Sequence, residues 1–112
     1  MRHTITDIGG DIVKEDDRYI VKDNTFLKNL ILSSTDLKPG KKTGGHKHVG
    51  QEEVYFFVSG TGKMIVDGDT YHEFAVKSGD VVLIPDGAFH QVINNGTENL
   101  YFVCVFDGNR NH

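Results

Sequence analysis

Glycine and proline punctuation is the feature that most restricts the fold of this chain. Thirteen glycines and two prolines divide the 112 residues into short apolar segments. Few of these segments keep the i, i+3, i+4, i+7 spacing that an amphipathic helix requires. Many short strands separated by turn residues are typical of a β-sandwich or a small barrel. The sequence therefore predicts an all-β fold.

Nine segments are expected to form strands, because each is rich in β-branched or aromatic residues and is bounded by Gly, Pro, Asn or Asp. They are residues 19–22, 27–33, 46–48, 53–59, 63–66, 70–76, 81–84, 90–94 and 100–106. The dipeptide Asp67-Gly68 predicts a tight hairpin turn in which the glycine has a positive φ.

The length of the chain suits one domain, since it is too short for two separate hydrophobic cores. We expect a single domain over residues 1–112, with an amino-terminal arm at 1–24, a β-barrel at 25–106 and a tail at 107–112. The lone cysteine, Cys104, permits no intrachain disulfide and no thiolate zinc cluster. A metal ion would have to be held by His and carboxylate side chains.

Composition and charge limit the classes of molecule that this chain is expected to bind. No apolar run is long enough to cross a bilayer, and the polar amino terminus lacks the apolar stretch of a secretory signal, so we expect a cytoplasmic protein with no membrane partner. The net charge of −4 has the wrong sign for binding nucleic acid. A local group of cations, either a solvated loop or an attractant for a small anion, consists of Lys38, Lys41, Lys42 and Lys47.

Both faces of two expected strands are apolar. Residues 53–59 carry Tyr55 and Phe57 on one face and valines with Phe56 on the other, and residues 100–106 repeat the pattern. A chain this small has to cover the second face with its amino-terminal arm or with another subunit. We therefore predict a homodimer packed through its sheets.

Three histidines and one glutamate form the candidate metal site. His46 and His48 are two residues apart, a spacing that puts both imidazoles on one face of a strand. Glu53 opens the next apolar segment, and His90 follows a turn-rich stretch. Imidazoles with one carboxylate suit a divalent first-row ion, and four such ligands leave two positions of an octahedral ion open for water or substrate.

The spacing of these residues resembles the two signatures of the cupin superfamily. The first reads Gly40-x5-His46-x-His48-x4-Glu53-x6-Gly60, and the second reads Gly79-x5-Pro85-x-Gly87-x2-His90-x3-Asn94. The resemblance implies a small single-domain cupin β-barrel, a double-stranded β-helix of the jelly-roll type. It also implies that one divalent transition metal ion, Zn, Mn, Fe or Ni, is bound by His46, His48, Glu53 and His90.

Glu52 fits only the loosest form of the first signature. The gap of six residues to Gly60 selects Glu53 instead. Strand alternation sets Glu52 on the opposite face.

Residues 43–48, 53–55, 81–85 and 88–90 look like the equivalent stretches of archaeal cupin-type phosphoglucose isomerases and of small sugar-isomerase-like cupins. That resemblance implies interconversion of an aldose and a ketose, with a small, possibly anionic sugar as the partner. Glu53 or a metal-bound hydroxide is then the candidate base, and Tyr55, unless it is only a core aromatic residue, donates to a substrate oxygen. Two alternatives remain open: an iron-dependent cupin dioxygenase at the same site, and a non-catalytic protein that binds a metal or a small ligand.

Overall fold

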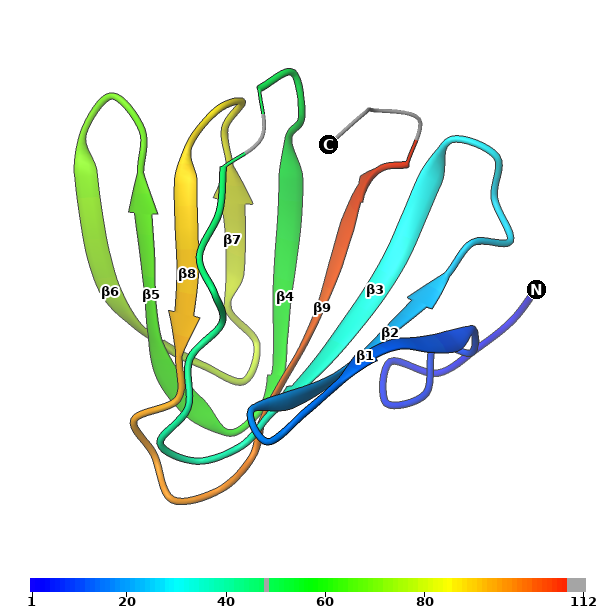
Figure 1. Cartoon of the computed structure of the whole chain (residues 1–112), viewed down its shortest axis with the longest axis horizontal. Helices are drawn as coiled ribbons and strands as arrows, with labels where there is room; N and C mark the ends of the chain where they lie inside the picture. The colour runs from blue at the N-terminus through cyan, green and yellow to red at the C-terminus, as the bar shows by residue number, and fades with distance from the viewer. Residues whose placement is uncertain (48, 109–112) are drawn as a thin grey trace.

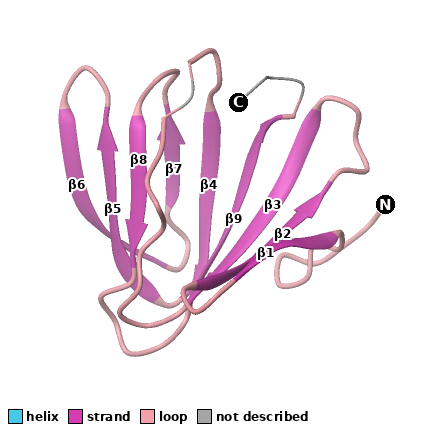
Figure 2. Ribbon diagram, viewed as in Figure 1, coloured by secondary structure: helices cyan, strands magenta, loops and turns pink. Residues whose placement is uncertain are grey.

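The computed structural model describes residues 1–47 and 49–108, in which all regular secondary structure is β-strand. In those ranges no helix exists that could span a membrane. The strands are β1 (Asp11–Glu15), β2 (Tyr19–Asn24), β3 (Leu30–Leu37), β4 (Glu53–Ser59), β5 (Thr61–Asp67), β6 (Tyr71–Lys77), β7 (Val81–Ile84), β8 (Phe89–Ile93) and β9 (Leu100–Asp107). The predicted all-β fold is confirmed, as Figure 2 shows.

Two antiparallel sheets face each other (Figure 1). The six-stranded sheet has the order β1-β2-β3-β9-β4-β7, and the three-stranded sheet has the order β6-β5-β8. From β4 onward the chain passes back and forth between the sheets, so that β9 lies between β3 and β4. This arrangement is the small jelly-roll barrel that the sequence predicted.

The hydrophobic core lies between the two sheets. The six-stranded sheet contributes Tyr55, Phe57 and Phe102, and the three-stranded sheet contributes Met64 and Val92. Tyr55 stacks on Phe102 with ring centroids 5.5 Å apart. Burial of each such side chain stabilises the fold by about 1.5–3 kcal/mol. These contacts make the inner wall on which the candidate site is built.

Strand bounds agree with prediction best in the second half of the chain. β4 and β7 have the predicted limits, whereas β3 begins at Leu30 and reaches Leu37. The later start has a local cause, because the side-chain oxygen of Asn24 accepts the backbone N–H of Phe26 at 3.0 Å and turns the chain. β1 was not predicted, since all five of its residues are exposed and give no alternating pattern.

The residues predicted to form an amino-terminal arm contribute to the six-stranded sheet and to its outer face. Residues 11–24 supply β1 and β2. Before them, Ile8 is 2% exposed, and its carbonyl accepts the side-chain N–H of Asn24 at 2.6 Å. At the other edge of the sheet, Val81 and Leu83 of β7 are 56% and 70% exposed. The described part of the chain therefore leaves apolar surface on the β7 side.

The β5–β6 hairpin differs from prediction. Pairing runs as far as Asp67 opposite Tyr71, so the loop has three residues, 68–70. Gly68 is not among the glycines with a positive φ, and its N–H donates to the carbonyl of Thr70 at 3.2 Å. The predicted positive φ at Gly68 is therefore wrong, because the extra loop residue removes the need for a two-residue primed turn.

Candidate metal centre and its pocket

Strand alternation brings Glu53 and His90 into the barrel. Along β4, Glu53, Tyr55 and Phe57 are buried, while their neighbours are half-buried. On β8 the same alternation buries His90. Glu53 is 7% exposed and His90 is 2% exposed, so a carboxylate and an imidazole meet away from bulk water. Glu52 is exposed, in agreement with its predicted position on the other face.

His46 reaches the same place from the segment before β4. Its N–H donates to the carbonyl of His90 at 3.2 Å, and the N–H of His90 donates to the carbonyl of His46 at 2.9 Å. The predicted strand at 46–48 is wrong for its described part, because this pair is an isolated bridge and no strand includes His46 or Lys47. The second predicted ligand of this segment, His48, lies outside the described residues.

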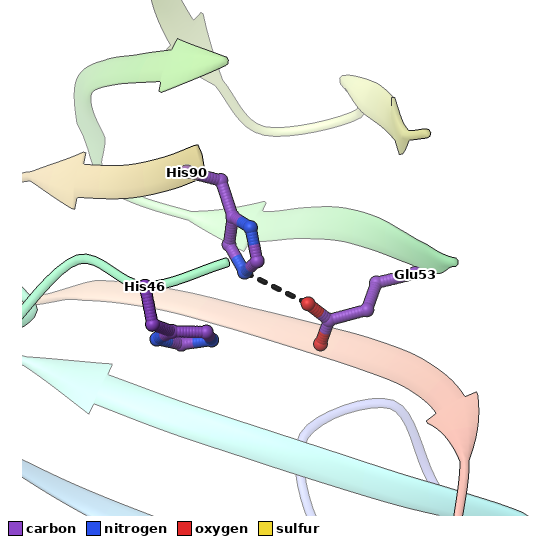
Figure 3. A group of neighbouring side chains, drawn as sticks. All are labelled: His46, Glu53 and His90. Atoms are coloured by element: carbon purple, nitrogen blue, oxygen red, sulfur yellow. Dashed lines mark ion pairs between the residues drawn. The ribbon is translucent and has the colours of Figure 1, made fainter. Parts of the chain in front are cut away.

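The side chains of His46, Glu53 and His90 point toward one another (Figure 3). One ligand atom from each lies within 4.8 Å of the others, close enough for a single ion. Nε2 of His90 is 2.8 Å from Oε2 of Glu53. The rings of His46 and His90 meet edge to face with centroids 4.4 Å apart. Unlike the other two residues, His46 is exposed, so the group is open on its side.

The donor set fits a divalent cation. Nδ1 of His90 lies 3.2 Å from the carbonyl oxygen of Ala88. A carbonyl can only accept, so Nδ1 carries the proton, and in the neutral ring Nε2 holds a lone pair. Nε2 is buried without a hydrogen-bond partner among the described residues. It faces a carboxylate, which is also an acceptor, and a cation between them would satisfy both groups.

Tyr55 lies beside this group. It is 6% exposed, and its ring meets that of His90 edge to face at a centroid distance of 5.7 Å. Burial raises the pKa of Tyr55 well above its ordinary value, and Cys104 and Glu53 nearby raise it further. The phenol therefore keeps its proton at neutral pH. It can act as a hydrogen-bond donor but not as a base.

A pocket of about 510 Å³ opens on the inner face of the six-stranded sheet. Its walls come from β1, β2, β3, β4 and β9 and from residues 43–46, and they include His46, Glu53 and Tyr55. Cys104 also lines it, and burial raises the pKa of this thiol, which stays neutral. The metal group is thus reached through a cavity large enough for a small organic ligand.

The cations of the pocket are not the predicted ones. Lys14 and Arg18 line it, whereas none of the four lysines at positions 38–47 does. Lys41 pairs instead with Asp17 at 3.6 Å, and Lys47 lines a separate cavity. Lys14 and Arg18 were missed because they belong to β1 and to the turn after it. No sequence pattern connected that hairpin with His46.

Comparison with known proteins agrees with the fold. The family model described as "Cupin domain" matches residues 33–106. The oxalate-binding protein of Thermotoga maritima is 32% identical over 84 residues, which cover 75% of this chain and 67% of that protein. The glucose-6-phosphate isomerase of Thermococcus litoralis is 27% identical over 105 residues, which cover 84% of this chain and 55% of the isomerase.

Among solved structures, one of Bacillus subtilis oxalate decarboxylase, described by its Mn(II) centres, superposes with a TM-score of 0.79 at 25% identity. The match covers 91% of this chain and 29% of the decarboxylase chain. This chain therefore corresponds to a part of that larger protein.

Proposed function

Because this chain belongs to the cupin domain family, we propose that it holds one divalent transition metal ion and isomerises a small sugar or sugar phosphate there. The proposed ligands are His46, His48, Glu53 and His90. The observation that carries the metal assignment is the buried Nε2 of His90, which has no hydrogen-bond partner among the described residues and faces the Glu53 carboxylate at 2.8 Å. At that distance a proton or a cation has to lie between the two acceptors, and a bound divalent ion would supply the positive charge.

A divalent ion supplies Lewis acidity, which polarises a carbonyl of a chelating substrate. Glu53 is the proposed base, and it would carry a proton between two adjacent carbons of the sugar. Tyr55 lies on the same face of β4. Its phenol, kept protonated by burial, would donate to the substrate oxygen on which negative charge develops.

The size of the pocket favours a sugar-sized ligand. Sites for small organic molecules usually have volumes of about 300–1,000 Å³, and this pocket measures about 510 Å³. A two-carbon dianion would fill little of it. The cationic side chains Lys14 and Arg18 on the wall suit a ligand with an anionic group.

Elemental analysis followed by a substrate panel tests this proposal. The expected result is one redox-silent divalent ion per chain and interconversion of an aldose and a ketose, seen by NMR. Reducible iron together with oxygen consumption would favour the dioxygenase alternative. Ligand binding without turnover in either assay would favour a non-catalytic binding protein.

We also propose a homodimer formed through the outer face of the six-stranded sheet. Val81 and Leu83 of β7 are exposed there, beside the half-buried Val54 and Phe56 of β4. Solitary exposed apolar residues are common, but a continuous apolar strip on a sheet usually meets a partner. A second copy would cover this strip symmetrically.

A further inference from the structure

We propose that Arg18, at the turn between β1 and β2, binds an anionic group of the ligand whose other end lies at the metal centre. The inference rests on the proposed function only in taking the pocket as the ligand site. Arg18 would then determine which ligands the pocket prefers. The ligand has chelating oxygens at one end and a phosphate or carboxylate group at the other.

The guanidinium of Arg18 is held in place by its neighbours. Its Nη2 lies 2.8 Å from Oδ2 of Asp16, and its Nε lies 3.2 and 3.3 Å from the two carboxylate oxygens. The group also lies over the ring of Tyr19, 4.4 Å from the centroid. A side chain fixed in this way loses little conformational entropy when it binds an anion.

The Asp16 carboxylate remains ionised over the working range of pH. Hydrogen bonds from the Arg18 side chain, and then from its backbone N–H, lower the pKa of Asp16 to about 2. The guanidinium is likewise always charged. Both groups of the pair therefore stay charged at neutral pH.

One nitrogen of the guanidinium is left available on the wall of the pocket that also contains His46 and Glu53. Nη1 takes no part in the contacts with Asp16, and it makes no hydrogen bond to the described residues. It points toward Gly44, where an added Cβ would lie 3.9 Å from it. Gly44 lines the same pocket and precedes His46 by two residues. An anion bound at Nη1 would thus lie beside the segment that carries His46, one of the proposed metal ligands.

Neither backbone conformation nor packing explains the glycine at position 44. Gly44 does not have a positive φ, and within 4 Å of an added Cβ there is only Nη1 of Arg18. Any L-residue could adopt this backbone. The effect of glycine here is to leave the space between Arg18 and the pocket clear.

Charges on the pocket wall support an anion at this end. Lys14 is a second cation, with Nζ 5.8 Å from the Tyr19 ring centroid, and it forms no ion pair with the described residues. The acidic side chains on the wall are Asp23 and Glu53. Both cations face the Tyr19 ring, and Asp23 lies four residues farther along β2.

Calorimetry with matched probes tests the role of Arg18. Metal-loaded wild-type protein is titrated with arabinose 5-phosphate, with arabinose, and with the sugar acid arabinonate. We expect the phosphate or the carboxylate form to bind more tightly than the neutral sugar. Arg18→Met should weaken binding of that form by about tenfold or more, the effect expected when a charge-assisted hydrogen bond is lost, and should leave arabinose unaffected. The two charged probes identify which anion the subsite prefers.

Two further variants make the test specific. Lys38→Met removes a cation that does not line the pocket and should bind like the wild type. Gly44→Leu fills the space beside Nη1 while leaving Arg18 and Asp16 intact, and it should reproduce the loss even where Arg18→Met lowers stability. Arg18→Lys should restore part of the preference, since a point charge replaces the planar group.

The proposed role of Arg18 is wrong if the wild-type protein binds neither charged probe more tightly than arabinose. It is also wrong if the wild-type protein binds none of the three probes. It is equally overturned by an Arg18→Met protein whose preference is unchanged. Charge preference that depends on Arg18, in a protein with no isomerase turnover, contradicts the proposed reaction and supports the assignment of Arg18.

Discussion

Nε2 of His90 lies 2.8 Å from Oε2 of Glu53. In the neutral ring Nε2 carries no proton, because Nδ1 donates its proton to the Ala88 carbonyl. The Ala88 carbonyl thus fixes the orientation of the His90 ring, as acceptors on the far nitrogen of metal-binding histidines usually do. Strands from opposite sheets meet at this contact, because Glu53 belongs to β4 and His90 to β8. A cation bound there would link the two halves of the barrel.

Metal removal should therefore destabilise the whole domain. A ligand at 100 times its Kd stabilises the native state by about 2.7 kcal/mol, and in a domain of this size this corresponds to roughly 10 °C in Tm. Differential scanning calorimetry before and after dialysis against a chelator measures the change. His72→Ala is the control, because His72 is exposed and contacts Thr70, and the Tm of this variant should still fall on chelation. If the Tm of His72→Ala did not change on chelation, the ion would be bound elsewhere than at His90.

Replacement of Tyr55 by Phe should separate chemistry from metal binding. The ring contacts with Phe102 and His90 remain, so metal content and Tm should stay close to those of the wild type. Isomerase turnover should fall by about 100-fold, since one hydrogen-bond donor to developing charge is lost. Tyr71→Phe, at an exposed position on β6, is the matched control. Unchanged turnover in Tyr55→Phe would make Tyr55 a core residue only.

The Arg18–Asp16 pair should be visible in an acid titration. The pKa of Asp16 is lowered from 3.8 to about 2 in the folded chain. A lowered pKa means that the contribution of the pair to stability is complete above the unfolded value and is lost as the pH falls toward 2. Carbon-13 NMR of the side-chain carboxyl measures this value directly, and Arg18→Met should return it toward 3.8. An ordinary Asp16 pKa in the wild type would mean that the pair does not form in solution.

The proposed dimer predicts that Leu83→Lys dissociates the protein. Leu83 is 70% exposed on the outer face of β7, so a lysine there costs the folded monomer little and adds repulsion between paired copies. Light scattering should give the dimer mass for the wild type and half of that mass for the variant. Tyr71→Lys, on a strand of the other sheet, should remain dimeric. A wild type that is monomeric at micromolar concentration would end this proposal.

Local patterns account for what the sequence predicted correctly. Along β4 the alternation of inward and outward side chains is regular, so it placed Glu53 and Tyr55 on one face without reference to the rest of the chain. His90 needed the resemblance of spacing to a known family, because nothing local distinguishes an inward histidine ligand from a satisfied core histidine. The structure then brings His90 and Glu53 together across the barrel.

Long-range placement accounts for what the sequence missed. Lys41 and Lys42 precede His46 closely, but the backbone of this segment pairs with β8, and Lys41 turns outward to Asp17. Arg18 is far from His46 in sequence and reaches the pocket only because β1 and β2 extend the sheet. Proximity in sequence indicated the wrong cations, since the direction of a side chain in a loop depends on tertiary pairing.

We propose that one ion is held by the residues grouped around His90. The metal content of this site is measured by elemental analysis of protein purified without added metal, for the wild type and Glu53→Gln, with Glu52→Gln as the exposed neighbouring control. We expect one divalent transition metal ion per chain in the wild type and in Glu52→Gln, and a large loss in Glu53→Gln. A wild type that binds no transition metal even when supplied with it, or a Glu53→Gln protein with full metal content, would mean that these residues do not form a metal site.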